Sequence, residues 1–201
     1  MVQVAIFDYG AGNIFSLKNS LEKAGALVDV ITDFDKPNDY SGILLPGVGN
    51  FDPAIHSIQN FSKMQFQDYV GTIPVLGICL GMEMFFEKSE EGKEKGLNVI
   101  DGEVVVLPSS MKVPHMGWND LEIKKSGKIL EGVDNGSWVY FVHSYRAKPV
   151  SDDVITAVSD YGIKVPAVVE YENFIGTQFH PEKSGKVGKI MIKNFLEECK
   201  K

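Results

Sequence analysis

Short apolar runs that alternate with helical patterns limit the fold of this chain more than any other feature. Four runs in the first half are apolar nearly throughout, and they span residues 2–7, 26–31, 42–45 and 73–78. Between them, apolar side chains recur at helical spacing, and the expected helices span residues 14–24, 53–69 and 80–87. Strands of this kind, separated by helices, predict a parallel sheet that is covered by helices on both faces.

The second half of the chain shows a different pattern. Six short segments are predicted as strands, and they span residues 99–107, 120–123, 138–143, 154–158, 167–171 and 175–179. Turn sequences lie between them, and only residues 187–199 have a strong helical pattern. We therefore expect an α/β fold of three layers, a mostly parallel sheet with added antiparallel strands, in one domain over residues 1–201.

The composition argues against several classes of partner. Lys and Arg number 20 against 27 Asp and Glu, a formal net charge of −7, whereas a nucleic-acid binder needs a cationic surface. No apolar run approaches the ~18 residues that span a bilayer, and we find no basic secretory leader. The two cysteines have no disulfide or zinc spacing. We expect a cytoplasmic protein with no nucleic-acid, membrane or metal partner.

A cysteine between two glycines is the most informative chemical motif. Residues 77–81, with the sequence GICLG, stand where a predicted buried strand meets a helix. A nucleophile there needs a sharp turn, and the glycines relieve crowding around it. The helix start favours the thiolate of Cys79 and offers the N–H of Leu80 to an oxyanion. A buried structural cysteine is the alternative, and we expect Cys199, on a terminal helix, to be inert.

A thiolate nucleophile needs a base, and four histidines compete for this role. If the chain is extended at His180, the side chain of Glu182 projects to the same side and can orient the imidazole. His143 has no carboxylate at this spacing, His56 lies on a predicted surface helix, and His115 falls in a predicted turn. We favour His180 with Glu182, and a structural histidine is the alternative.

Two more glycine-rich turns follow predicted strands. The turn PGVGN at residues 46–50 can bring a backbone N–H to the same site, because neighbouring strand ends of a parallel sheet share one crevice. An ordinary Pro-Gly turn is the alternative. The turn GAGN at residues 10–13 lacks the third glycine of a dinucleotide-binding motif, and we expect no cofactor.

Together, these motifs resemble the class I (triad-type) glutamine amidotransferases over essentially the whole chain. The resemblance implies a flavodoxin-like fold, with Cys79 as nucleophile, His180 as base and acid, and Glu182 as its orienting partner. It also implies hydrolysis of the side-chain amide of L-glutamine through a glutamyl thioester, which releases L-glutamate and ammonia.

Four segments narrow the resemblance to the glutaminase subunits of imidazole glycerol phosphate synthases, and they span residues 9–13, 46–51, 114–119 and 180–185. This branch implies a heterodimer with a (β/α)8-barrel cyclase subunit. The cyclase uses the ammonia to form imidazole glycerol phosphate and aminoimidazole carboxamide ribonucleotide in histidine biosynthesis. We expect Cys79 to be poorly activated without that partner, because an uncoupled glutaminase would waste glutamine.

Further roles follow from the same resemblance, position by position. The backbone N–H groups that match the oxyanion hole belong to Val48 and Leu80. The positions that match the glutamine pocket are Gly49, Glu91, Ser144 and Tyr145. The positions that match the face toward the cyclase are Asn13, Trp118, Tyr140 and Lys183.

Glu83 departs from the family pattern, because many members carry glutamine at this position. A carboxylate cannot donate the hydrogen bonds of an amide unless it is protonated. The contribution of Glu83 to substrate binding is therefore left open.

Two other functions compete with this one. The same chemistry could serve another acceptor, such as anthranilate or pyridoxal phosphate synthesis, but residues 46–51 and 114–119 argue against it. A non-catalytic scaffold is disfavoured by the intact Cys79, His180 and Glu182. A metal enzyme is disfavoured because the histidines lack ligand spacing.

Overall fold

The computed structural model describes residues 1–10, 13–32, 40–61 and 71–201. Its main sheet has the strand order β2-β1-β3-β4-β13-β12-β11-β8. The parallel strands are β2 (Leu27–Ile31), β1 (Gln3–Phe7), β3 (Gly42–Leu45), β4 (Val75–Ile78) and β13 (Phe174–Thr177). The antiparallel strands are β12 (Lys164–Tyr171), β11 (Ile155–Asp160) and β8 (Glu122–Ile123). The predicted fold is confirmed.

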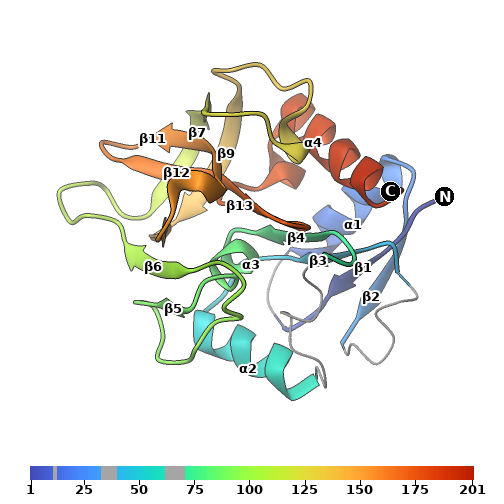
Figure 1. The fold of residues 1–201 in the computed structure, drawn as a ribbon, viewed down its shortest axis with the longest axis horizontal. Coiled ribbons are helices and arrows are strands. Elements are labelled where there is room, and N and C mark those ends of the chain that lie inside the picture. Colours follow the sequence, from blue (N-terminus) through green and yellow to red (C-terminus); the bar gives the residue numbers. More distant parts are fainter. Residues whose placement is uncertain (11–12, 33–39, 62–70) are drawn as a thin grey trace.

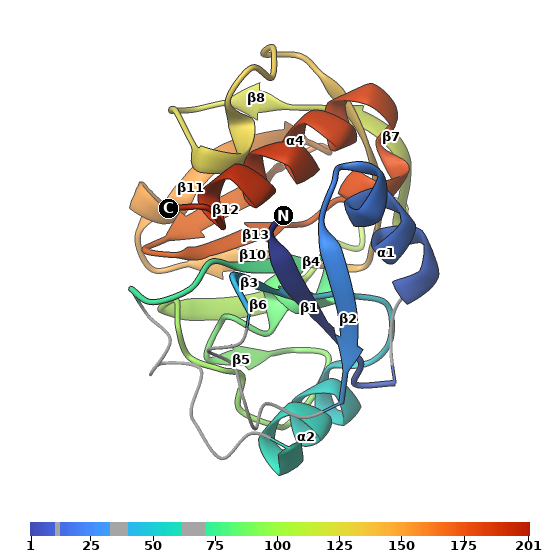
Figure 2. The same ribbon diagram turned by 90° about the vertical axis from the view of Figure 1, so that its right-hand side faces the viewer.

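Helices cover both faces of the parallel strands, as Figures 1 and 2 show. On one face lie α1 (Ile14–Lys23) and α4 (Gly185–Glu198), whose Leu17 and Phe195 share a core with Ile6 of β1. On the other face lies α2 (Phe51–Phe61), whose Ile55 shares a second core with Phe7 of β1. Successive side chains of one strand thus enter different cores, which explains the apolar runs without alternation.

Two smaller sheets flank the main one. One contains β10 (Tyr145–Pro149), β6 (Gly102–Val106) and β5 (Lys88–Ser89), and the other pairs β7 (His115–Asp120) with β9 (Trp138–His143). Short 3-10 helices complete the fold at η3 (Lys128–Leu130), η4 (Asp152–Val154) and η5 (Pro181–Lys183).

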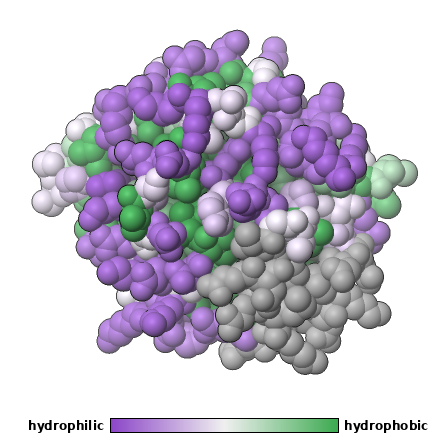
Figure 3. All heavy atoms as spheres, viewed as in Figure 1, coloured by the Kyte–Doolittle hydropathy of each residue, from purple (hydrophilic) through white to green (hydrophobic). Residues whose placement is uncertain are grey.

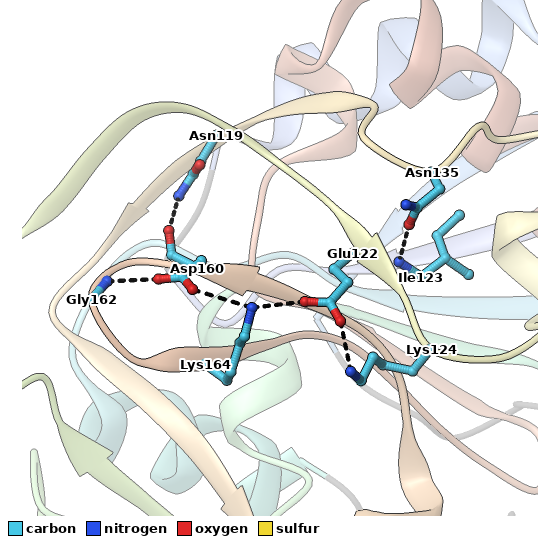
Figure 4. A network of polar contacts seen from close by, with 8 residues as sticks. All are labelled: Asn119, Glu122, Ile123, Lys124, Asn135, Asp160, Gly162 and Lys164. Atoms are coloured by element: carbon cyan, nitrogen blue, oxygen red, sulfur yellow. Dashed lines mark hydrogen bonds and ion pairs between the residues drawn. The ribbon is translucent and has the colours of Figure 1, made fainter.

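Polar contacts tie the β7–β9 pair to the antiparallel edge of the main sheet (Figure 4). The Asn119 side-chain amide donates to the Asp160 carbonyl at 2.9 Å. The ammonium of Lys164 lies 2.7 Å from Glu122 and 3.1 Å from Asp160. These pairs are exposed, so each contributes little to stability. They connect β7 with the end of β11, and the start of β12 with β8 and the end of β11.

Several predicted elements differ from those observed. The helix expected over residues 80–87 is wrong, because α3 (Leu80–Glu83) has only one turn. The N–H groups of Phe85 and Phe86 donate to carbonyls only three residues back, and the N–H of Glu87 donates to Gly102 of β6 rather than to Glu83. Strands β5 and β10 were not predicted, and β6 is shorter than the expected strand at residues 99–107.

Two further predictions differ at their boundaries or in kind. His115 lies on β7 and not in a turn, because residues 115–120 pair with β9 along their whole length. Helix α2 begins at Phe51 rather than at residue 53, and residues 62–69 of the expected helix lie outside the described part.

Across the described ranges, no helix is long and apolar enough to cross a membrane. The same residues contain no group of three or more His, Cys, Asp or Glu side chains that could hold a metal ion. Cys79 and Cys199 are both free thiols.

Candidate active site

Cys79 lies on a strained turn between β4 and α3. Its φ angle is +52°, a region that residues other than glycine rarely adopt. A Cβ atom at Gly77 would lie 2.6 Å from the carbonyl carbon of Gly81, and one at Gly81 would lie 2.0 Å from the Leu45 oxygen. The predicted crowding is confirmed. Strain of this kind persists only where packing enforces it, which is typical of functional sites.

Cys79 is only 7% exposed, and Glu83 lines the same cavity. The Sγ atom of Cys79 donates to the Val142 carbonyl at 3.7 Å and accepts from Gln178 Nε2 at 3.9 Å. Burial, and next the charge of Glu83, raise the pKa of the thiol well above its usual value, although the N–H of Leu80 opposes this. The predicted preference for thiolate is wrong for this structure, because desolvation outweighs the few donors that α3 supplies.

His180 and Glu182 form a buried pair beside the nucleophile strand. Their Nδ1 and Oε1 atoms are 2.9 Å apart, and the side chains are 2% and 5% exposed. The backbone is extended at His180 but not at Glu182, which lies in η5, and the contact predicted for an extended chain is nevertheless present. His180 Nε2 has no hydrogen-bond partner among the described residues. The Cys79 N–H donates to Thr177 at 2.7 Å, so the nucleophile adjoins the strand that leads to His180.

The remaining histidines have other partners. His115 Nδ1 lies 2.9 Å from His143 Nε2, and His143 Nδ1 lies 2.6 Å from the Tyr145 carbonyl. Because a carbonyl only accepts, His143 donates from Nδ1 and accepts from His115 at Nε2. Burial lowers the pKa of both imidazoles to about 4. His56 is exposed and lies 3.3 Å from Glu94. Neither nitrogen of His143 is free to act as a base.

The turn after β3 packs directly on the nucleophile turn. A Cβ atom at Gly47 would lie 2.0 Å from the Ile78 oxygen and 2.4 Å from the Leu80 nitrogen, so only glycine permits this approach. Val48 and Gly49 follow and line the same cavity as Cys79. The predicted meeting of the two turns is therefore confirmed.

A cavity of about 280 Å³ opens at Cys79. Its lining comprises Val48, Gly49, Cys79, Leu80, Glu83, Glu91, Pro114, Val142, His143, Ser144 and Tyr145. This set includes every residue predicted for the oxyanion hole and the glutamine pocket. It contains two carboxylates and neither Lys nor Arg, so the cavity suits a ligand that carries a cationic group.

The two carboxylates of the cavity have different partners. Glu91 accepts from the Phe51 N–H at 3.1 Å and so also caps the start of α2. Glu83 is 4% exposed and accepts from Gln178 Nε2 at 2.9 Å. Burial, followed by the charge of Glu91, raises the pKa of Glu83 to about 7.

This raised pKa predicts a pH-dependent effect of Glu83→Gln on stability. Between the ordinary pKa of 4.5 and about 7, the unfolded chain releases the Glu83 proton while the folded chain retains it, so rising pH destabilises the native protein. We expect Glu83→Gln to raise the free energy of unfolding by about 2–3 kcal/mol more at pH 8 than at pH 5. Urea unfolding at both values measures this difference. Glu87→Gln is the exposed control, and an equal effect of Glu83→Gln at both pH values would contradict the prediction.

Sequence patterns missed Gln178 and the His115–His143 pair. Gln178 has no exposed surface, and its amide contacts both the nucleophile and Glu83. A signal was present, because a glutamine within a buried apolar strand must find buried partners for its amide. The histidine pair depends on the register of β7 and β9, which local patterns do not reveal.

The residues predicted to face a partner lie in separate segments. Asn13 caps α1, its Oδ1 accepting from the Ser16 N–H at 3.2 Å, while residues 11–12 of that turn are outside the described part. Trp118 and Tyr140 form an edge-to-face pair across β7 and β9, with ring centroids 6.0 Å apart. Lys183 follows Glu182 in η5.

Comparisons with known proteins identify the family of this chain. The family model "Glutamine amidotransferase class-I" matches residues 5–199. Imidazole glycerol phosphate synthase subunit HisH of Archaeoglobus fulgidus is 46% identical, with 98% of this chain and 100% of the relative covered. The same subunit of Bacillus cereus is 45% identical over 96% of this chain and 93% of its own length. The solved structure of PurLQS from Thermotoga maritima shares the fold, with a TM-score of 0.75, 20% identity, and coverage of 98% and 99%. This chain belongs to the class-I glutamine amidotransferase family.

Proposed function

We propose that this chain is the glutaminase subunit of an imidazole glycerol phosphate synthase, formed by one glutamine amidotransferase domain over residues 1–201. The observation that carries the proposal is the buried His180–Glu182 pair beside the strained Cys79 turn, in a chain of this family. The relatives named HisH, which match almost the whole chain, support the choice of synthase. We also propose a cytoplasmic location, a compartment in which free thiols such as those of Cys79 and Cys199 persist.

In the proposed reaction, the sulfur of Cys79 attacks the side-chain amide carbon of L-glutamine and gives its proton to His180. The backbone N–H groups of Val48 and Leu80 stabilise the oxyanion. His180 then protonates the leaving nitrogen, so ammonia departs and a glutamyl thioester remains. Water, deprotonated by His180, attacks the thioester carbonyl carbon, L-glutamate departs, and the released sulfur of Cys79 takes the proton back from His180. Glu182 holds Nδ1 throughout and stabilises the imidazolium.

The charges of the cavity support glutamine as the substrate. Glu91 and Glu83 provide negative charge for the α-ammonium, and Tyr145 and Ser144 lie on the same wall, where we place the α-carboxylate. Glu83, whose pKa is raised to about 7, accepts a hydrogen bond from the Gln178 amide. When it is ionised, it repels anionic ligands. Ammonium binding favours the ionised form of both carboxylates.

The surroundings of Cys79 support a resting state in which the nucleophile is poorly activated until a partner binds. The thiol is buried, its pKa is raised, and its Sγ faces the Val142 carbonyl. Reorientation of the Gly47–Val48 peptide on docking would complete the oxyanion hole. Removal of one such donor costs about 10²–10³ in rate, which is enough to keep the isolated subunit nearly silent.

We propose a heterodimer in which a (β/α)8-barrel cyclase docks on the β7–β9 pair. Hydrophilic side chains cover most of the described face in Figure 3, whereas Met116, Trp118 and Trp138 of this pair are 62%, 50% and 57% exposed. Exposed aromatic side chains are typical of binding surfaces. The Tyr140 carbonyl accepts from the His180 N–H at 2.9 Å, so the same strand contacts the proposed base.

The proposed docking surface predicts a loss of affinity on Trp118→Ala. We expect the dissociation constant for the cyclase to rise by about 10–100-fold, because a central aromatic side chain can carry about 2 kcal/mol or more of an interface. Isothermal titration calorimetry measures it. Tyr171→Ala, an exposed aromatic change on β12, is the matched control, since Tyr171 is 41% exposed outside the proposed surface. Equal effects of the two changes would refute this surface.

Nitrogen transfer tests the proposed function directly. The chain, the cyclase and its nucleotide substrate are incubated with glutamine that carries heavy nitrogen in its side-chain amide. We expect the label in imidazole glycerol phosphate. Labelled ammonia without labelled product would retain the glutaminase chemistry and assign the chain to another acceptor. No release of label in the complete mixture would favour a scaffold.

A further inference from the structure

The side-chain amide of Gln178 joins the nucleophile to the buried carboxylate of the cavity. Its Nε2 atom lies 2.9 Å from Glu83 Oε1 and 3.9 Å from Cys79 Sγ. Both hydrogens of this nitrogen are thus directed to acceptors, and the side chain is fully buried. The backbone N–H of Gln178 donates to Ala167 at 2.9 Å, which anchors the residue just beyond β13.

Glu83 determines which way this amide points. An ionised carboxylate only accepts, so it requires the NH₂ group, and not the carbonyl, on the side of Glu83 and the sulfur. With the opposite orientation, two oxygens would face each other, and the amide oxygen would also face Cys79. The Gln178 Oε1 atom, on the far side, has no hydrogen-bond partner among the described residues.

We propose that Gln178 is a positioning residue for the nucleophile: held by Glu83, its amide donates an N–H to the sulfur of Cys79 and stabilises the thiolate. The effect of Gln178 on turnover rests on the proposed glutaminase function, which this role extends. This role explains how an acidic residue is accommodated at position 83. The negative charge of Glu83 disfavours the thiolate, but the same carboxylate orients the Gln178 amide, whose N–H stabilises the thiolate.

The other groups around the sulfur make this donor important. Beyond the effect of burial, the charges of Glu83 and Glu182 raise the pKa of Cys79, and Cys79 in turn raises that of the buried Tyr9. None of these three side chains can carry a positive charge. Among the residues that the structure describes, neither Lys nor Arg lines the cavity. The Leu80 N–H and the Gln178 amide are the groups that lower the pKa of the thiol. If this hydrogen bond to the charged sulfur is lost, we expect the fraction of Cys79 present as thiolate to fall about tenfold.

Alkylation of Cys79 by iodoacetamide in the full chain tests the inference, because it needs neither glutamine nor a cyclase. Rates are measured across pH for each cysteine by peptide mass spectrometry, with Cys199 as the internal reference. Gln178→Met keeps the length of the side chain and removes both donors. We expect Cys79 to react about tenfold more slowly at pH 8, with its profile displaced by about one unit to higher pH and Cys199 unchanged.

Gln178→Glu is the second variant and preserves the shape of the amide while removing its donor to the sulfur. If Gln178→Met fails to fold, this variant still carries the test, and it should react at least as slowly. A Cys79 profile that superimposes on that of the original chain in a folded variant would overturn the inference.

Glutaminase kinetics with the cyclase separate the two proposals. Gln178→Met should lower kcat with little change in the KM for glutamine. A shifted alkylation profile in a chain that never releases glutamate would refute the proposed function and retain the role of Gln178. Full glutaminase activity with an unshifted alkylation profile would retain the proposed function and refute the role of Gln178.

Discussion

Replacement of Cys79 with alanine is expected to lower glutamate release by at least about 10⁴-fold when the chain is measured with its cyclase and the nucleotide ligand. The thioester cannot form without the sulfur, and the oxyanion donors alone leave little of the rate. Steady-state release of glutamate from glutamine measures the loss. The φ of +52° at Cys79 is strained for alanine as well, so thermal unfolding of the variant verifies that the turn survives.

Cys199→Ala is the matched control for this change. Cys199 is also a buried free thiol, but it lies at the end of α4 and packs near Gly42, away from the cavity. We expect its activity to stay within about twofold of the original. Substantial turnover in Cys79→Ala would show that the nucleophile has been misassigned.

Loss of His180 is expected to have the second largest effect. His180→Asn should lower kcat by about 10⁴-fold, because the thiol then has no base and the departing nitrogen has no acid. Glu182→Gln should cost about 10²–10⁴-fold, since an amide can hold the imidazole but cannot stabilise its charge. Both are measured as glutamate release in the complete mixture, with folding followed by circular dichroism.

A second His–Glu pair in the chain provides the control. His56 on α2 lies 3.3 Å from Glu94, but these side chains are 56% and 38% exposed, and neither lines the cavity. His56→Asn should therefore leave kcat unchanged. If it reduced kcat as strongly as His180→Asn, the effect could not be attributed to burial beside the nucleophile.

Much of the fold could be predicted because the local patterns of apolar side chains and turn residues indicate where strands and helices lie. Strands β1 and β3 are apolar on both faces since a helix-covered core lies on each side. The prediction of residues 138–143 coincides with β9, where Asp134-Asn135-Gly136 marks the preceding turn. The meeting of the two glycine turns followed from adjacent strand ends.

The rest depended on contacts between distant segments. Helix α3 stops after one turn, and the N–H of Glu87, which would extend it, donates instead to the distant Gly102 carbonyl of β6. The backbone is extended at His180 and enters η5 at Pro181, and the His180–Glu182 contact forms across this change of conformation. Likewise, the protonation of Cys79 follows from burial and from Glu83 rather than from the helix start, and neither is visible in the local motif.

Glutamate release from glutamine by the isolated chain, by the chain with the cyclase, and by the chain with the cyclase and its nucleotide ligand tests the central claim most directly. The account predicts weak activity in the first mixture and strong stimulation in the third, abolished by Cys79→Ala. Full activity of the isolated chain would contradict it, because neither the buried thiol nor the proposed reorientation of the Gly47–Val48 peptide could then limit turnover.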